Sequence, residues 1–472
     1  MKQIQKKVMA IIILLSFCFS TNYCGAQHLD WWKDAKFGLF VHWGLYSVTA
    51  GDWQGHRYKG NEHFMLYERI PWKTYGTIAQ RFNPNQFNAD QWVSRAKNAG
   101  MKYIVITAKH HDGFAMYNSP SSSYNIVKMT PWHKDPMALL AKSCKKYGIK
   151  LCFYYSLGRD WQDPDVPTNW PVKAGRSNTW NYPDEDGKDL DKYFHRKVLP
   201  QIKELLTQYG PIGVLWFDTP ELITKVQSRE LKAFIHSIQP DCIVNSRIGN
   251  GLGDYTVQEQ KIGGKINLHP WESCVTMSGG WGYNKYDTSW KSPELLIRQL
   301  TETVSNGGNY LLNIGPKADG RFPDSAVSRL VKIGYWMKKN GQAIYGAHPW
   351  KISLEKIVSV HPEKSIGKKE QISLVHGMQD VINDNTSKDI IPEIRFTEKG
   401  QGNSATLYVF LNSLLEDRVL IQSLNAGDFK KIQKVELLSG GKISWKQTDA
   451  GLEITVPRVK SGDINVRVLA IN

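Results

Sequence analysis

The chain has 472 residues, of which 41% are hydrophobic and 22% charged, so it can bury a large core and form two domains. Its formal net charge of +16 comes from scattered basic residues, and the sequence has no recognisable nucleic-acid-binding module, which argues against a nucleic-acid partner. The cysteines form no Cys-x-x-Cys pair, so we expect buried free thiols rather than a zinc site or a disulfide framework.

The N-terminus has the features of a secretory signal peptide. Lysines precede an apolar run at residues 8–19, and the small residues of Cys24-Gly25-Ala26 suit a signal peptidase. The twelve residues of this run are too few to span a bilayer, so no membrane span is expected. We expect residues 1–26 to be removed and the protein to be exported to the periplasm or the extracellular space. Acylation of Cys24 as a lipoprotein is the alternative, although residues 21–23 lack the small, apolar lead-in of such sites.

Residues 27–348 alternate between strand-like and helical segments, which predicts an α/β fold. Helical patterns at 136–146, 192–208 and 293–304 fall between apolar, strand-like runs, and this alternation is typical of a TIM-like (β/α) barrel. Only seven strands are clear, so we expect an irregular barrel. The predicted strands are 37–43, 103–110, 150–156, 213–218, 242–247, 271–276 and 310–314.

Residues 349–472 have short strand patterns that follow one another with turns between them, which predicts a C-terminal antiparallel β-sandwich domain. The segment 363–370 is a polar loop. The predicted strands are 371–375, 394–397, 405–411, 419–423, 434–438 and 452–456.

The run at 213–218 joins five uncharged residues to one carboxylate, Asp218. In a barrel, the last residue of such a strand emerges where the active site is built. Trp216 lies on the same face of the strand as Asp218, because side chains alternate between the two faces. An indole ring is therefore expected beside the carboxylate. The alternative is that Asp218 only caps the following turn or helix.

Five other predicted strands of the barrel also carry polar residues, most of them near the ends where barrel enzymes place their chemistry. One such residue has many structural explanations, but six strands with the same pattern indicate an active site. These residues are His42, His110, His111, Tyr154, Tyr155, Asp218, Arg247 and Glu272.

Three other kinds of site are less well supported. A metal-dependent barrel hydrolase would show His-x-His on its first strand, and adjacent His110 and His111 would leave a strand on opposite faces. No Gly-x-Ser-x-Gly elbow is present for a serine nucleophile. The glycines at 306–317 lack the spacing of a phosphate-binding loop. Two carboxylates surrounded by imidazole, phenol, guanidinium and indole groups instead describe a glycosidase site.

Six motifs follow one another along residues 29 to about 350. They are WWxxAKFGLFVHWGLYSV at 31–48, AKHHDGF at 108–114, LWFD at 215–218, WExC at 271–274, WGY at 281–283 and GGNYLLNIGP at 307–316. With these motifs the sequence resembles the α-L-fucosidases of glycoside hydrolase family 29. The C-terminal part fits the sandwich usual in that family but has no motif of its own.

The resemblance implies a retaining mechanism through a covalent fucosyl-enzyme, with Asp218 as the nucleophile. Two residues compete for the acid/base role. Glu259 matches a Thr-Pro-Glu-like segment that carries the role in some members, and we favour it because a loop residue can approach the leaving group. Glu272, in the Trp-Glu motif, is the rival. Without a catalytic role, Glu272 would be a structural carboxylate and Glu259 a solvated loop charge.

The resemblance also assigns the sugar-binding residues, with departures at two positions. His63 stands where the family often has tryptophan, and Thr49 replaces a common proline; both bear on the pocket rim and the leaving-group preference. Tyr155 is a less certain neighbour of Tyr154. The residues implied in binding fucose are His42, Glu62, His110, His111, Tyr154, Trp216, Arg247 and Trp281.

We therefore expect an exported, exo-acting α-L-fucosidase that releases terminal fucose from oligosaccharides or glycoconjugates without a metal or organic cofactor. One alternative is a catalytically silent fucose-binding protein on a hydrolase scaffold. Another is a barrel glycosidase for a related sugar such as α-L-galactose, because an apolar pocket around the fucose methyl group rejects an added hydroxyl only weakly.

Overall fold

The computed structural model describes residues 29–58, 60–167, 178–356, 392–412, 417–457, 459 and 463–472. The predicted signal peptide, the polar loop at 363–370 and the predicted strand at 371–375 lie outside these residues. No helix in the described part of the chain is long and apolar enough to cross a membrane.

Eight parallel strands form one curved sheet, in the order β7-β6-β5-β4-β1-β10-β9-β8. A parallel bridge between Asn245 and Tyr255 joins the two end strands, β7 and β8, so the sheet approaches a closed barrel. This confirms the TIM-like fold. The strands are β1 (Phe37–Val41), β4 (Tyr103–Lys109), β5 (Lys150–Ser156), β6 (Ile212–Asp218), β7 (Ile243–Val244), β8 (Thr256–Glu259), β9 (Trp271–Thr276) and β10 (Asn309–Ile314); β2 (Asp52–Trp53) and β3 (His56–Arg57) make a separate ribbon.

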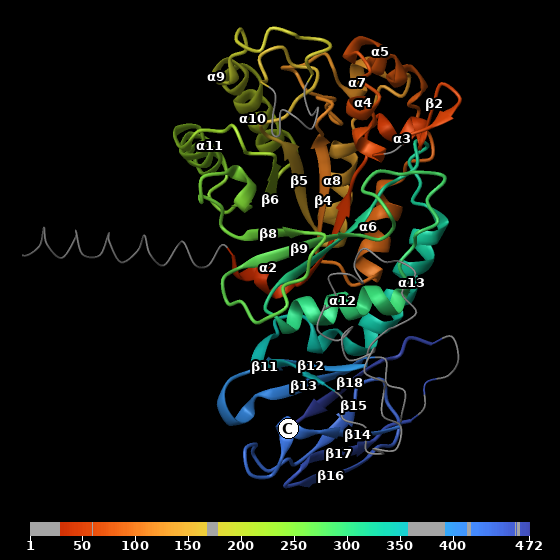
Figure 1. Cartoon of the computed structure of the whole chain (residues 1–472), viewed down its shortest axis with the longest axis vertical. Helices are drawn as coiled ribbons and strands as arrows, with labels where there is room; N and C mark the ends of the chain where they lie inside the picture. Colours follow the sequence, from red (N-terminus) through yellow and green to blue (C-terminus); the bar gives the residue numbers. More distant parts are fainter. Residues whose placement is uncertain are drawn as a thin grey trace, which may run out of the picture.

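Helices cover the outside of the barrel (Figure 1). Their starts follow local capping rules: the Asp135 side chain accepts from the first turn of α8, and Thr224 and Gln227 form a capping box on α11. The helices are α2 (Asp30–Ala35), α3 (Tyr46–Thr49), α4 (Phe64–Tyr67), α5 (Trp72–Gly76), α6 (Ala89–Asn98), α7 (Ile126–Met129), α8 (Pro136–Tyr147), α9 (Leu190–Tyr193), α10 (Leu199–Gln208), α11 (Lys225–Ile238), α12 (Pro293–Ser305) and α13 (Asp324–Asn340).

The barrel departs from regular alternation between β7 and β9. The predicted strand at 242–247 ends at Val244, because the Asn245 side chain forms hydrogen bonds to the N–H and the C=O of Phe217 (2.9 and 3.0 Å) that a longer strand would make with its backbone. The barrel strand missing from the sequence prediction is β8. Its residues, Thr256–Glu259, are half-buried or exposed, so they lack an apolar run.

The C-terminal strands form a five-stranded sheet, β11-β12-β13-β18-β15, and a three-stranded sheet, β14-β17-β16. Side chains of both sheets share one apolar core, as the sandwich prediction requires. Figure 1 shows these sheets beyond α12 and α13, and Trp336 of α13 donates to the Val466 carbonyl of β18 at 2.7 Å. The strands are β11 (His348–Lys356), β12 (Glu393–Lys399), β13 (Thr406–Asn412), β14 (Arg418–Ile421), β15 (Val435–Leu437), β16 (Ser444–Thr448), β17 (Gly451–Thr455) and β18 (Val466–Ile471).

Candidate active site

Asp218 is the last residue of β6, at the carboxyl end of the barrel strands. Its Oδ2 accepts a hydrogen bond from the Tyr154 hydroxyl at 2.7 Å, and its Oδ1 accepts from Nη1 of Arg247 at 2.5 Å. The N–H of Thr219 also donates to Oδ1, at 2.9 Å. Thr219 has a φ of 55°, a strained backbone conformation for a β-branched residue. The chain therefore turns sharply after β6, and three donors fix the carboxylate.

Burial and the neighbouring groups have opposite effects on the pKa of Asp218. Burial acts to raise its pKa, but the Arg247 guanidinium and the Tyr154 hydroxyl outweigh burial, and the pKa lies below its ordinary value. The side chain is still 14% exposed. Asp218 is thus an ionised carboxylate that a ligand can reach, which is what a nucleophile requires.

Arg247 links Asp218 to a second carboxylate. It lies in a short 3₁₀ turn, residues Ser246–Ile248, directly after β7. Its Nη2 donates to Oε2 of Glu259 at 2.5 Å, while Nη1 holds Asp218. The Glu259 side chain is 42% exposed. Glu259 was expected on a loop, but it ends β8, so its backbone is held by the barrel sheet.

Glu272 lies inside the barrel and is fully buried. Its Oε2 accepts from the Tyr103 hydroxyl at 2.6 Å, and its Oε1 accepts from Nε1 of Trp216 at 2.9 Å and the Tyr255 hydroxyl at 3.3 Å. All three donors are neutral, so burial dominates and raises the pKa of Glu272 to about 7. The same contact directs the indole N–H of Trp216 into the core, and Trp216 is only 2% exposed.

The Tyr154 ring, whose hydroxyl donates to Asp218, lies against two imidazoles. The His110 ring stacks on the Tyr154 ring with centroids 5.4 Å apart, and the His42 and Tyr154 centroids are 5.5 Å apart. Asn313 donates from Nδ2 to the Trp281 carbonyl, so its Oδ1 accepts from Nδ1 of His42 at 2.7 Å. Burial lowers the pKa of His42 to about 4, so its ring is neutral and Nε2 is a hydrogen-bond acceptor.

The protonation of His111 follows from its hydrogen bonds. Ser156 uses its only proton to donate to the Arg159 carbonyl at 2.7 Å, so it accepts from Nδ1 of His111 at 2.6 Å. Burial holds the pKa of His111 well below its ordinary value, which leaves Nε2 with its lone pair. That Nε2 lies 3.6 Å from Oδ2 of Asp218.

A second buried carboxylate, Glu62, joins two segments at the mouth of the barrel. Its Oε2 accepts from the N–H of Gly282 at 2.9 Å, next to Trp281. Burial raises the pKa of Glu62 to about 7. The Trp281 ring is partly exposed and lies 5.0 Å from the His42 ring, between centroids. Trp281 can therefore form a wall of the pocket beside the histidines.

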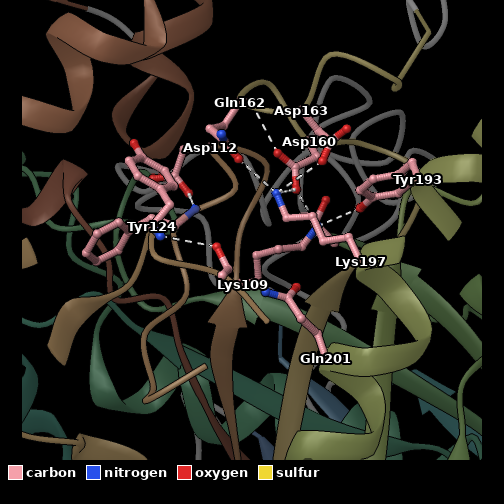
Figure 2. A network of polar contacts seen from close by, with 12 residues as sticks. Lys109, Asp112, Tyr124, Asp160, Gln162, Asp163, Tyr193, Lys197 and Gln201 are labelled. Carbon is pink, nitrogen blue, oxygen red and sulfur yellow. Dashed lines mark hydrogen bonds and ion pairs between the residues drawn. The ribbon is translucent and has the colours of Figure 1, made fainter. Parts of the chain in front are cut away.

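A buried ion-pair network lies at the end of β4, directly before the two adjacent histidines in the sequence (Figure 2). Lys109, the last residue of β4, donates to Oδ2 of Asp160 at 3.0 Å and to the Tyr193 hydroxyl at 2.7 Å. Lys197 also contacts Oδ2 of Asp160, at 2.7 Å. Gly113 has a φ of 76°, and a Cβ there would lie 2.3 Å from Oδ1 of Asp160. The segment after β4 is thus packed tightly on this network, which the sequence prediction missed.

The structure corrects two side-chain placements. His110 and His111 do not point to opposite faces, because β4 ends at Lys109 and both residues lie beyond the strand; their ring centroids are 4.2 Å apart. Tyr155 points away from Asp218, and its hydroxyl donates to Gln201 of α10 at 2.8 Å. The other predicted residues at the mouth gather around Asp218 and Arg247.

Among the described residues, one group of side chains could hold a metal ion. It consists of His63, His110 and His111, whose nitrogen atoms lie within 4.8 Å of one another. His63 follows Glu62 and was considered in the sequence only as a residue of the pocket rim. No local pattern joins it to the histidines near residue 110, so only the fold brings the three together.

A family model described as alpha-L-fucosidase matches residues 20–342. The tissue alpha-L-fucosidase of Mus musculus is 33% identical over 351 residues, which cover 69% of this chain and 73% of that protein. The alpha-L-fucosidase of Dictyostelium discoideum is 31% identical over 348 residues, which cover 68% and 72%.

Solved structures are similar over two thirds of the chain or more. An alpha-L-fucosidase from Vibrio sp. strain EJY3 superposes with a TM-score of 0.78 at 32% identity, covering 95% of this chain and 73% of that one. Isoenzyme 1 from Paenibacillus thiaminolyticus gives 0.76 at 29% identity, covering 95% and 99%. The alpha-L-fucosidase AlfC from Lactobacillus casei, solved with α-L-fucose, gives 0.63 at 38% identity, covering 67% and 99%.

Proposed function

The chain belongs to the alpha-L-fucosidase family of glycoside hydrolases, and on that premise we propose that it removes terminal α-L-fucose by a retaining mechanism through a covalent fucosyl-enzyme. The observation that carries this proposal is the position of Arg247, which holds Asp218 and Glu259 with one guanidinium. Retaining glycosidases need two carboxyl groups close together, about 5–5.5 Å apart.

In the first step, ionised Asp218 attacks the anomeric carbon of fucose. Glu259 donates a proton to the leaving oxygen, the glycosidic bond breaks, and a β-linked fucosyl ester forms on Asp218. In the second step, Glu259 takes a proton from water, the water oxygen attacks the anomeric carbon, and the ester bond to Asp218 breaks. Each step inverts the anomeric carbon, so the product has the α configuration of the substrate.

We favour Glu259 over Glu272 as the acid/base because its side chain is exposed and a glycosidic oxygen can approach it. Glu272 is enclosed on both oxygens by Tyr103, Trp216 and Tyr255, and a glycosidic oxygen cannot approach it without opening the core. The Glu259 side chain is 42% exposed and accepts a hydrogen bond from the same guanidinium, that of Arg247, that binds Asp218. To protonate a leaving group, Glu259 rotates from Arg247 toward the leaving oxygen.

The polar residues at the mouth would bind the fucose hydroxyls. Neutral His42 and His111 each offer a ring nitrogen as an acceptor, and the Glu62 carboxyl group adds another partner. Trp281 forms the exposed aromatic wall. Trp216 would act indirectly, because its ring stacks on the Tyr154 ring with centroids 5.6 Å apart.

We further propose that residues 1–26 direct export to the periplasm or the extracellular space, and that the substrates are fucosylated oligosaccharides or glycoconjugates. Residues 27–348 would form the catalytic domain and 349–472 a sandwich domain.

Proton NMR of a reaction with an aryl α-L-fucoside tests this function. We expect hydrolysis, with α-L-fucose as the first anomer to appear, and a lower rate on the matching α-L-galactoside. If β-L-fucose appears first, the retaining mechanism is wrong. Binding of the fucoside without hydrolysis would instead indicate a silent fucose-binding protein.

A further inference from the structure

His63, His110 and His111 form a compact cluster at the mouth of the barrel. The His63 and His111 rings are stacked, with centroids 5.3 Å apart and planes 9° apart, and the His63 and His110 centroids are 5.8 Å apart. One nitrogen from each ring lies within 4.8 Å of the other two. His63 reaches the cluster from the turn at Asn61–His63, far from the other two in sequence.

Two of the three rings, His110 and His111, have nitrogen atoms that could bind an ion. Nδ1 of His111 donates to Ser156, so in the neutral ring the lone pair is on Nε2. Nδ1 of His110 is buried and has no hydrogen-bond partner among the described residues. Metal-binding histidines have the same arrangement as His111, in which one ring nitrogen donates to an oxygen and the other binds the ion.

The spacing suits a small divalent ion after a minor adjustment. Zinc binds imidazole nitrogen at about 2.0–2.1 Å, so two ligand atoms of one ion lie at most about 4.2 Å apart. The nitrogens here span up to 4.8 Å. The side chain of His63 is 26% exposed, whereas His110 and His111 are buried, so closing this gap would require a movement of the His63 ring.

We propose that this three-histidine cluster is a binding site for a divalent transition-metal ion of the zinc type, and that the bound ion inhibits the enzyme. Three imidazoles are the donor set that zinc, copper and nickel prefer over magnesium or calcium. Oδ2 of Asp218 lies 3.6 Å from Nε2 of His111, so the ion would sit against the proposed nucleophile and engage its carboxylate. It would also occupy the ring nitrogens that would otherwise face a sugar.

Isothermal titration calorimetry of metal-free protein with Zn²⁺ tests the site directly. We expect one zinc per chain, and no binding of Mg²⁺ under the same conditions. His63→Phe keeps an aromatic ring in place but removes a ligand, and we expect the dissociation constant for zinc to rise about tenfold or more. The more conservative His63→Gln should have a similar effect. His269→Ala, at an exposed histidine outside the cluster, should bind zinc as the unaltered protein does.

Circular dichroism of each variant checks that it is folded, and Co²⁺ in place of zinc gives a second signal. The intense visible absorption of tetrahedral Co²⁺ should appear with the unaltered protein and be lost with His63→Phe. Absence of zinc binding, or equal affinity in the folded His63→Phe and His63→Gln variants, would overturn the proposal.

The inhibition experiment rests on the proposed function, whereas the zinc-binding experiment does not. Zinc should slow hydrolysis of an aryl α-L-fucoside, and each variant is compared with its own zinc-free rate. The zinc concentration for half inhibition should rise about tenfold in His63→Phe, in step with its dissociation constant. If the protein does not hydrolyse fucosides, calorimetry still decides whether the site exists; zinc that binds without slowing hydrolysis would overturn the inhibitory role.

Discussion

In the interior of the barrel, Glu272 is enclosed by the neutral donors of Tyr103, Trp216 and Tyr255; at the mouth, Asp218 is held by the cation of Arg247. Both carboxyl groups are deeply placed, yet the pKa of Glu272 is raised to about 7 and that of Asp218 is lowered. Hydrogen bonds alone do not overcome burial, but hydrogen bonds from a cation do. The charge of the donor therefore separates a carboxyl group whose pKa is raised from one whose pKa is lowered, and an ionised carboxylate is the form that can attack carbon.

Among substitutions at the mouth and in the interior of the barrel, removal of the Asp218 carboxylate should cause the largest loss of activity. Asp218→Ala should lower kcat for an aryl α-L-fucoside by about 10⁴-fold or more, because it removes the carboxylate that is proposed to form the ester. Asp241→Asn, at an exposed position, is the matched control and should keep full activity. A loss of less than about tenfold in the folded variant would exclude Asp218 as the nucleophile.

Glu259→Gln should act selectively, according to the leaving group. General acid catalysis contributes about 10²–10⁴-fold, so hydrolysis of a fucosylated disaccharide should fall by that factor. The first step with a nitrophenyl leaving group should fall much less, because that group departs without a proton. Glu221→Gln is an exposed control. Equal losses in the first step for both substrates would argue against an acid role for Glu259.

Glu272→Gln should change stability with pH more than activity. The folded protein holds a proton on Glu272 up to about pH 7, whereas the ordinary pKa is 4.5, so the unaltered protein loses stability as pH rises between these values. Glutamine has no such titration. The free energy of unfolding of the variant, relative to the unaltered protein, should therefore rise from pH 5 to pH 8 by an amount on the order of 1–3 kcal/mol. Differential scanning calorimetry at each pH measures the corresponding shift in unfolding temperature.

Glu436→Gln, in the sandwich sheet with its side chain 50% exposed, is the control for that experiment. The pH profile of Glu272→Gln is read against the profile of this variant, which makes the same substitution on the protein surface. If Glu272→Gln behaves like this control and also abolishes activity, Glu272 has a catalytic rather than a structural role.

The sequence predicted those parts of the fold that apolar runs encode. Strands such as β5 and β6 are buried along most of their length, so their composition identifies them. β8 could not be found this way because its residues are half-buried or exposed, and its place in the sheet depends on pairing with β9. The early end of β7 depends on the contact between Asn245 and Phe217, 28 residues apart.

The candidate site was predicted from residue types and motifs, but the environment of each residue was not. Glu259 and Glu272 are the same residue type, so the sequence alone does not distinguish their environments. The fold does: Glu272 accepts a hydrogen bond from Tyr103, 169 residues away, whereas Glu259 accepts one from Arg247. The network of Lys109 with Asp160 and the cluster formed by His63 likewise join segments that have no local relation in the sequence. Burial and charge at these positions are products of the tertiary fold.

The anomeric configuration of the products formed with azide tests the roles of the two proposed catalytic carboxylates most directly. Glu259→Ala should still form the fucosyl ester from an aryl α-L-fucoside, and azide should then invert it a second time to give α-L-fucosyl azide, identified by proton NMR. Asp218→Ala should give β-L-fucosyl azide, because azide attacks the substrate once. If Glu272→Ala, and not Glu259→Ala, forms the α-azide, the acid/base is the carboxyl group in the barrel interior, which contradicts the assignment of Glu259.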